Sequence, residues 1–219
     1  MRKSIALLSR CSLFDGLRTE ELEKLVHCLS PRSRKVEKNA TVFMEDQEPN
    51  FVGIVLSGGL HIIRNDYGGN RLIVARIGPG ELFGEAFSLG KVKKLPISIM
   101  AVEMSELFLF SSKRLVQPCA SVCGFHAALI RNLIHDLARK NTMLMQKIEH
   151  VTRRTTREKL LSYLSAQARQ AKNRTFDIPF NRQELADYLA VDRSALSAEL
   201  GRMRTEGIIA FRKNHFELR

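Results

Sequence analysis

Residues 181–209, NRQELADYLAVDRSALSAELGRMRTEGII, carry the pattern of two short helices joined by a tight turn. Asn181 is a favourable N-cap for the first helix and Asp192 for the second, and the turn between the helices falls at residues 190–191. A helix pair of this size is typical of the helix-turn-helix, which places its second helix in the major groove of DNA. The stretch therefore predicts a nucleic-acid reader.

The second predicted helix has two chemically different faces. Helical spacing turns four apolar residues inward, namely Ala195, Leu196, Leu200 and Met203. The outward face carries Arg193, Ser194, Ser197, Ala198 and Arg202. Arginine and serine donate hydrogen bonds to guanine and to phosphate oxygens, so this face suits DNA.

The residues after Gly207 extend this prediction. The segment 208–218, IIAFRKNHFEL, has the pattern of two short strands around a basic turn, which indicates a winged helix-turn-helix. Residues 153–219 hold 14 lysines and arginines against 8 acidic residues, and the whole chain has a net charge of +12. Such a surplus favours a polyanionic partner. The motif taken alone is also compatible with an ordinary helical hairpin that has a solvated basic face.

Length and composition limit the remaining choices. With 219 residues, of which 44% are hydrophobic and 26% charged, the chain is long enough for two modest domains. No apolar run approaches the ~20 residues that span a bilayer, and residues 1–12 lack a signal-peptide pattern, so we expect a cytoplasmic protein without a membrane partner. The four scattered cysteines are expected to be reduced thiols. Catalytic motifs such as HExxH, GxSxG or a Walker loop are absent from the sequence, so we do not expect an enzyme.

In the N-terminal half, the spacing of the apolar residues changes from that of a helix to that of strands. A helix is predicted over residues 19–26 with Thr19 as its N-cap. From residue 41, short apolar runs alternate with glycine-rich turns, and these runs are residues 52–56, 60–63, 72–77, 97–102 and 107–110. The pattern predicts a compact antiparallel barrel or roll. Its turn at residues 80–86, GELFGEA, is a place where backbone could approach a small molecule, although the glycines could equally be structural.

Helical periodicity returns over residues 125–153. Its apolar stripe recurs at spacings of three and four, and we predict that it forms the seam of a dimer through Ile130, Ile134, Leu137, Asn141, Leu144, Ile148 and Val151. A single buried Asn141 would fix the register of two paired helices. The alternative is that the stripe packs on its own roll. Just before the helix, Cys119, Cys123 and His126 are of types that bind metals, but three ligands are incomplete for a closed site.

This order of elements resembles the Crp/Fnr family of bacterial transcription regulators. Four segments carry the resemblance: LFDGLRTEELEKL at 13–25, VLSGGLHIIR at 55–64, GPGELFGE at 78–85 and the helix pair at 181–209. The resemblance implies an α+β fold with an N-terminal antiparallel β-roll of the cyclic-nucleotide-binding type at 1–124, a dimerisation helix at 125–153 and a winged helix-turn-helix at 154–219. It also implies an effector-controlled homodimer that binds double-stranded DNA and acts with RNA polymerase.

The resemblance also places an effector site. In members that bind cyclic AMP, a Gly-Glu pair is followed by an Arg-Ser or Arg-Thr pair that holds the phosphate. Gly84 and Glu85 match the first pair, whereas Leu95 and Pro96 stand at the second, so the phosphate would lose its main partner. The positions that meet the base align with Leu144 and Met145. We therefore expect a small-molecule effector other than cyclic AMP, of unknown identity, bound near Phe83, Gly84, Glu85, Ala86, Leu95, Pro96, Ile97, Leu144 and Met145.

For DNA, the family's base-reading positions correspond to Arg193, Ser194, Ser197 and Ala198. The glutamate common at position 194 and the arginine common at position 198 are both absent, so the usual half-site is not implied. The expected phosphate contacts are Arg182, Gln183, Arg202, Lys213, Asn214 and His215. Two alternatives stay open: a redox, metal or haem sensor acting through Cys119, Cys123 and His126, and a constitutive DNA binder with a vestigial ligand domain.

Overall fold

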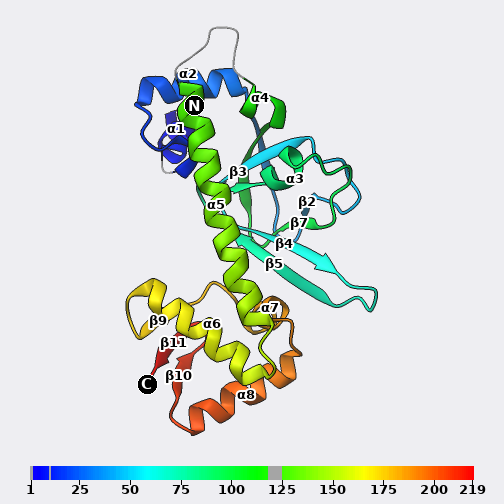
Figure 1. Ribbon diagram of the computed structural model, residues 1–219, viewed down its shortest axis with the longest axis vertical. Helices are drawn as coiled ribbons and strands as arrows, with labels where there is room; N and C mark the ends of the chain where they lie inside the picture. Colours follow the sequence, from blue (N-terminus) through cyan, green and yellow to red (C-terminus); the bar gives the residue numbers. More distant parts are fainter. Residues whose placement is uncertain (1, 10, 118–124) are drawn as a thin grey trace. The chain divides into compact units, whose positions relative to one another are not determined.

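The computed structural model describes residues 2–9, 11–117 and 125–219 (Figure 1). Contacts within the chain divide it into two units. The first comprises Met1–Asn65 with Val74–Lys140, and the second comprises Asp66–Ile73 with Asn141–Arg219. Strand β5 and helix α5 contribute residues to both units. Cys119 and Cys123, two of the candidate metal ligands, lie outside the described residues.

The first unit is built on two four-stranded sheets, whose ladders at β1–β8, β3–β8, β3–β6, β2–β7 and β4–β7 are antiparallel. One sheet has the order β1-β8-β3-β6, from β1 (Arg32–Val36), β8 (Ser105–Ser111), β3 (Phe51–Ser57) and β6 (Leu82–Phe83). The other has the order β2-β7-β4-β5, from β2 (Thr41–Phe43), β7 (Ser98–Ala101), β4 (Leu60–Asn65) and β5 (Arg71–Ile77). The helices are α1 (Arg2–Leu8), η1 (Ser12–Phe14), α2 (Thr19–Leu29), α3 (Glu85–Leu89), α4 (Ser112–Val116) and α5 (Phe125–Val151). This architecture confirms the predicted roll and the long helix that follows it.

Strand β3 explains how this unit holds together, because it is buried on both faces. Successive side chains of a strand point to opposite sides. Ile54 and Leu56 pack into one core with helices α1, α2, α4 and α5, whereas Val55 packs into the second core between the sheets. Because each face of β3 packs into a different core, the residues on both faces must be apolar, and the strand has a continuous apolar run.

A close approach between β3 and β6 fixes the second core. A Cβ atom on Gly53 would lie 2.1 Å from Cζ of Phe83, so only glycine leaves room for that ring. The Phe83 side chain is buried, and its ring centroid lies 6.2 Å from that of Phe43. One residue further along, Gly84 adopts a φ of +82°, a conformation that side chains rarely adopt, and it lets the chain turn into α3.

The start of helix α2 differs from the prediction. The N-cap is Arg18 rather than Thr19, since the Arg18 backbone N–H donates to Glu21 Oε2 at 2.8 Å and the Arg18 guanidinium binds the same carboxylate. Thr19 is therefore the first helical residue, and its hydroxyl makes no cap. The predicted helix exists, but its boundary is set by an ion pair.

The second unit combines three helices with a three-stranded antiparallel sheet near its C-terminal end. Its helices are α6 (Thr156–Ala171), α7 (Arg182–Leu189) and α8 (Arg193–Thr205), and its strands are β9 (Thr175–Asp177), β10 (Ile209–Arg212) and β11 (His215–Leu218). The antiparallel sheet has the order β10-β11-β9. Leu185, Leu196, Leu200 and Phe216 are buried in this unit. The helix pair and the wing were predicted, whereas α6 and β9 were not.

In the described part of the chain, no helix is both long enough and apolar enough to cross a bilayer.

We expect Gly53→Ala to lower the free energy of unfolding by about 1–3 kcal/mol, the usual cost of overpacking a core. The added methyl group would overlap the buried ring of Phe83. Urea denaturation followed by circular dichroism measures the change. Gly201→Ala is the matched control: apart from its chain neighbours and the backbone of α8, no heavy atom of the described residues lies within 4 Å of a Cβ at this position, so alanine should stabilise by about 0.5–1 kcal/mol. An unchanged unfolding midpoint for Gly53→Ala would contradict the packing described.

Candidate DNA interface and effector site

Side-chain caps fix the two helices of the helix-turn-helix. Asn181 Oδ1 accepts from the Glu184 N–H at 3.0 Å, and Glu184 Oε2 accepts from the Asn181 N–H at 2.8 Å, which completes a capping box. Asp192 Oδ1 accepts from the N–H groups of Ser194 at 2.7 Å and Ala195 at 3.0 Å. Both predicted N-caps are confirmed. Between them Ala190 turns the chain in the left-handed conformation, with a φ of +52°.

The outer face of α8 is polar, as predicted. Leu196, Leu200 and Met203 are buried, but Ala195 is exposed, so its predicted place in the core is wrong. The reason is its position in the first turn, beside the Asp192 cap and away from the packed part of the helix. Its outward neighbours are all exposed: Arg193, Ser194, Ser197, Ala198 and Arg202. Of these, the Ser194 hydroxyl donates to Asp192 Oδ1, which leaves Ser194 only acceptor capacity for a base.

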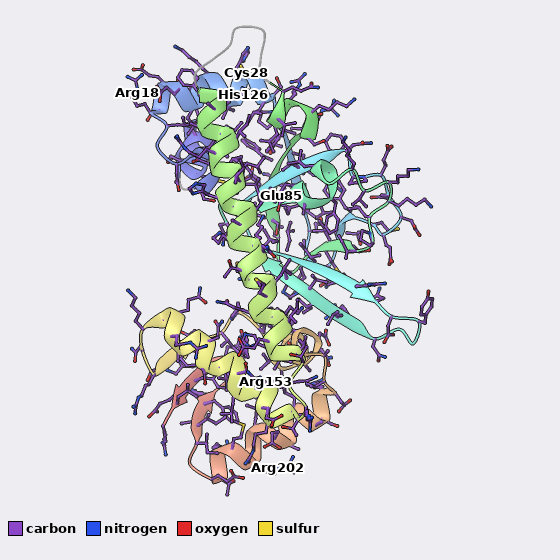
Figure 2. All side chains as sticks on the ribbon, viewed as in Figure 1. Arg18, Cys28, Glu85, His126, Arg153 and Arg202 are labelled. Carbon is purple, nitrogen blue, oxygen red and sulfur yellow. The ribbon has the colours of Figure 1, made fainter. Side chains whose placement is uncertain are left out.

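A buried carboxylate attaches α8 to α6. Glu199 accepts from Arg157 Nε at 2.6 Å and from Arg202 Nη2, while Arg157 also donates to Glu206 Oε1 at 2.6 Å. The hydrogen bond from Arg157 is the main reason that the pKa of Glu199 lies below its usual range. Arg202 is exposed on α8 (Figure 2), and the ion pair engages Nη2 of its guanidinium. Neither Arg157 nor Glu199 was singled out from the sequence.

The residues predicted to contact phosphates have different surroundings. Lys213 is exposed in the turn of the wing and Asn214 is half-buried beside it. His215 Nδ1 lies 2.9 Å from Asp177 Oδ1 across the β11–β9 ladder. Gln183 donates its amide to Asp187 Oδ1 at 2.7 Å. Arg182 is half-buried and donates to the Lys213 carbonyl, so its guanidinium is already engaged within the unit.

The predicted effector residues of the first unit separate into two environments. Phe83, Gly84, Glu85, Leu95 and Ile97 are buried, whereas Ala86 and Pro96 are exposed. Leu95 and Ile97 belong to the core between the sheets. Leu144 and Met145 are exposed on the part of α5 that belongs to the second unit.

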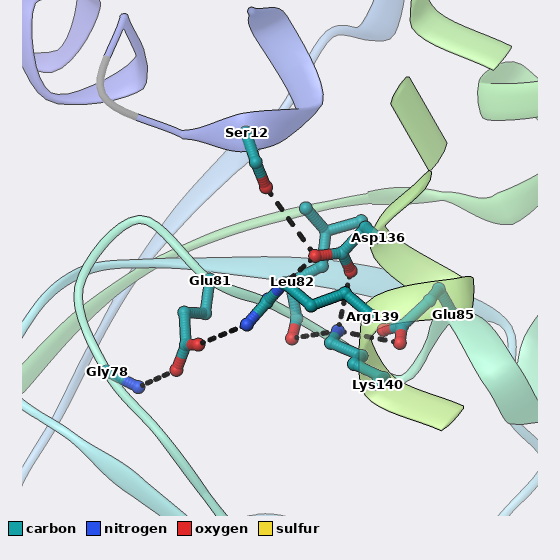
Figure 3. A network of polar contacts seen from close by, with 8 residues as sticks. All are labelled: Ser12, Gly78, Glu81, Leu82, Glu85, Asp136, Arg139 and Lys140. Atoms are coloured by element: carbon teal, nitrogen blue, oxygen red, sulfur yellow. Dashed lines mark hydrogen bonds and ion pairs between the residues drawn. The ribbon is translucent and has the colours of Figure 1, made fainter. Parts of the chain in front are cut away.

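A polar network surrounds Glu85 (Figure 3). Lys140 Nζ of α5 donates to Glu85 Oε1 at 2.7 Å and to the Leu82 carbonyl at 2.8 Å, and it lies 3.0 Å from Asp136 Oδ2. Arg139 bridges Asp136 at 2.8 Å and Glu81 at 3.5 Å. Burial raises the pKa of Asp136, but the charge of Lys140 and the hydrogen bond from Arg139 outweigh it, so the net pKa lies below the usual value. The second oxygen of Glu85, Oε2, is buried and has no hydrogen-bond partner among the described residues.

This network was missed in the sequence, although a signal existed. Asp136 and Lys140 stand one helical turn apart, and Asp136 interrupts an otherwise apolar face between Leu133 and Leu137. A carboxylate at an inward-facing position requires a cation or hydrogen-bond donors beside it.

The apolar stripe of α5 is largely uncovered. Ile134 and Ile148 are each 59% exposed and Leu144 is 45% exposed. Asn141 is exposed as well, whereas Ile130, Leu137 and Val151 are half-buried. Most of the predicted seam is thus available to a partner.

The described cysteines do not form a metal site. Within residues 2–9, 11–117 and 125–219, no three His, Cys, Asp or Glu side chains cluster as metal ligands. Cys11 is buried, and desolvation raises the pKa of its thiol to about 12, so it stays protonated. His126 is buried in the first turn of α5, and Cys28 is a half-buried thiol on α2 (Figure 2).

A lysine lies inside the second unit. Lys147 of α5 is 8% exposed, its Nζ donates to the Ile73 carbonyl, and the same atom lies 4.4 Å from the ring centroid of Tyr188 on α7. Desolvation lowers the pKa of Lys147 to about 8. The ammonium group therefore contacts the helix-turn-helix directly, through the face of an aromatic ring.

Family models recognise both parts of the chain. A cyclic nucleotide-binding domain model matches residues 33–121, and a Crp-like helix-turn-helix domain model matches residues 158–219. A cyclic nucleotide-binding roll followed by a Crp-like winged helix-turn-helix defines a DNA-binding transcription regulator, which is not an enzyme. The chain belongs to the Crp/Fnr family of transcription regulators.

Known proteins agree with this assignment. The chain is 27% identical over 215 residues to the cyclic AMP receptor protein of Thermus thermophilus, covering 94% of this chain and 92% of that protein. It is 25% identical over 217 residues to the transcriptional activator protein FnrL of Cereibacter sphaeroides, covering 94% and 80%. Among solved structures, the c-di-GMP responsive global regulator CLP of Xanthomonas campestris has the same fold, with a TM-score of 0.73, 17% identity and coverage of 90% and 98%.

Lys147 should make the stability of the second unit depend on pH. Its pKa of about 8 in the folded protein lies below the ordinary 10.5, so the unfolded chain binds more protons between these values. Stability should therefore rise as the pH increases from about 8 to about 10.5, by about 3 kcal/mol for a shift of this size. Chemical denaturation of wild type and Lys147→Met at several pH values measures the difference. If the free energy of unfolding changed with pH in the same way in both proteins, a buried, desolvated ammonium group would be excluded.

Proposed function

We propose that this regulator acts as a homodimer joined along α5, and that a small molecule other than cyclic AMP controls it. In the cytoplasm, the bound dimer would present its two α8 helices to neighbouring half-sites and regulate RNA polymerase there. A ligand that binds two arrangements of the dimer unequally shifts the population toward one of them. Such a shift would alter the spacing of the two α8 helices and hence the affinity for DNA.

The uncovered stripe on α5 supports the dimer. Ile134, Leu144 and Ile148 expose large apolar side chains along one helix, and exposed apolar stripes of this length mark interaction surfaces. Asn141 lies within the same stripe and suits a polar pair at the centre of a two-stranded seam. A second copy of α5 is a complementary partner for this pattern.

We expect Ile148→Glu to convert the dimer to a monomer at micromolar concentration, because a pair of carboxylates would face each other in an apolar seam. Analytical ultracentrifugation measures the mass. Met104→Glu is the matched control, since Met104 is 74% exposed and lies outside α5. A monomeric wild type, or an Ile148→Glu variant that remains dimeric, would rule out this seam.

The charge of the Glu85 network argues against a cyclic nucleotide, and this is the observation on which the effector proposal rests. Three carboxylates, Glu81, Glu85 and Asp136, share two cations, Arg139 and Lys140. The network is therefore net negative before any ligand arrives. A cyclic phosphate bound beside it would meet repulsion rather than a free cation, and burying an unpaired anion costs several kcal/mol.

The position of Leu95 supports the same conclusion. Cyclic-AMP-binding members carry their phosphate-pairing arginine at the position that corresponds to Leu95, and here an apolar side chain packs into the core between the sheets. The nearby lysines could supply charge to a phosphate, but they are point charges without the fixed two-pronged geometry of arginine. Lys91 and Lys93 are exposed, and Lys94 pairs with Asp46 at 3.7 Å on the surface.

The unpaired oxygen of Glu85 indicates the chemistry of the effector. Glu85 Oε2 is buried without a hydrogen-bond partner among the described residues, and such an acceptor is stabilised by a hydrogen-bond donor. An uncharged or weakly polar molecule that carries a hydroxyl or amide donor fits this oxygen and needs no arginine at position 95. The Thermus relative, which is named a cyclic AMP receptor, makes cyclic AMP the competing candidate.

Native mass spectrometry of the anaerobically purified protein tests the proposal. We expect a dimer with the added mass of a small organic molecule, and we expect Glu85→Gln to reduce the occupancy at least tenfold. Glu48→Gln is the matched control, because Glu48 is exposed and its carboxylate accepts a hydrogen bond from Asn50 on the surface. Added cyclic AMP should leave the melting temperature unchanged; a cyclic-AMP-dependent rise that Glu85→Gln abolishes would overturn the effector proposal. A bare dimer that ignores every added metabolite would instead favour the constitutive binder.

A further inference from the structure

Arg182 begins α7, but its guanidinium points into the wing. Nη2 donates to the Lys213 carbonyl at 2.8 Å. The guanidinium carbon lies 4.7 Å from the ring centroid of Phe211 and 5.1 Å from that of Phe216. Nη1 is buried and has no hydrogen-bond partner within the described chain. This guanidinium is thus directed at strands β10 and β11.

The turn that Arg182 contacts is strained. Arg212 pairs with His215 across the ladder, so Lys213 and Asn214 alone form the hairpin turn. Lys213 has a φ of +53°, in the left-handed region that residues with a Cβ atom avoid. Both carbonyls of the turn accept hydrogen bonds from outside it, that of Lys213 from Arg182 and that of Asn214 from the Ile178 N–H at 2.9 Å. External donors therefore hold the conformation of the wing tip.

Phe211 connects the wing to both helices of the DNA-binding motif. The guanidinium of Arg204, in the last turn of α8, lies 5.3 Å from the same ring that Arg182 contacts. Phe211 and Phe216 are themselves stacked, with centroids 5.6 Å apart. A planar guanidinium can stack on rings and donate in its plane at once, which an ammonium cannot. Arg182 therefore packs against the wing as part of its structure.

We infer that Arg182 is a positioning residue for DNA binding: it holds the wing turn so that Lys213 meets a phosphate, and it does not contact DNA itself. The alternative is a direct phosphate contact, as its place at the start of α7 suggests. The two roles differ in whether a lysine can substitute for Arg182. Lysine keeps the charge that attracts a phosphate, whereas positioning requires the planar, stacked guanidinium.

Full-length Arg182→Lys and Arg182→Met are the test pair. The probe is a duplex of about 30 base pairs, long enough for two half-sites one turn apart, enriched by the wild-type protein from a random pool. Fluorescence anisotropy gives Kd. We expect both variants to bind roughly tenfold more weakly, which corresponds to about 1.4 kcal/mol. In a Lys213→Ala background, Arg182→Lys should cause no further loss, because the group that it positions is already gone.

Two further measurements separate positioning from loss of fold. Trypsin cleavage after Lys213, followed by mass spectrometry, should accelerate in Arg182→Lys while the melting temperature stays close to wild type. Phe211→Leu removes the ring but no charge, and it should weaken binding as Arg182→Lys does, even if the arginine variants prove unstable. Arg169→Lys is the matched control and should bind within about twofold of wild type, because Arg169 is exposed in the last turn of α6 and the substitution keeps its charge. Wild-type affinity in Arg182→Lys, or losses that add to that of Lys213→Ala, would overturn the inference.

Discussion

The buried carboxylate of Asp136 is the constraint on which the first unit depends. Its side chain is fully buried, so it must be matched by cations, and Lys140 and Arg139 on the same helix supply them. These cations in turn bind Glu85, Glu81 and the Leu82 carbonyl. One ionic cluster thereby attaches α5 to the turn where the family binds its effector. A molecule that changes the pairing of Glu85 would act directly on the contact between α5 and the roll.

Most of the fold could be predicted from the sequence, because most elements carry a strong local signal. Strand β3 has an uninterrupted apolar run, and the helix-turn-helix has two N-caps at the correct spacing. The missed elements lack such a signal or show it weakly. Strand β1 reads RSRKV and is held by pairing with β8 at the sheet edge, so its charges face solvent. Helix α6 does begin with a capping box from Thr155 to Glu158, a signal that could have been used.

The candidate sites were less predictable, because sequence reveals residue types but not their partners. Arg193 and Ser197 lie exposed on α8, where helical periodicity placed them. Arg182, by contrast, follows an N-cap and has the usual appearance of a phosphate contact, yet its guanidinium is engaged with Phe211 and the Lys213 carbonyl. The partner of Glu85 is Lys140, 55 positions further along the chain, and only the folded roll brings the two side chains together. Contacts of that separation leave no local pattern.

The internal use of arginines in the second unit also bears on how the protein would find its operator. Arg157 is paired with Glu199 and Glu206, and Arg182 is turned toward the wing, so the number of basic residues in this unit overstates the number of cations offered to a DNA backbone. Attraction to arbitrary DNA sequences scales with the cations that actually reach phosphates. A regulator whose arginines partly make contacts within the protein should bind DNA of random sequence more weakly. It should leave wrong sites sooner and scan a chromosome faster than its composition suggests.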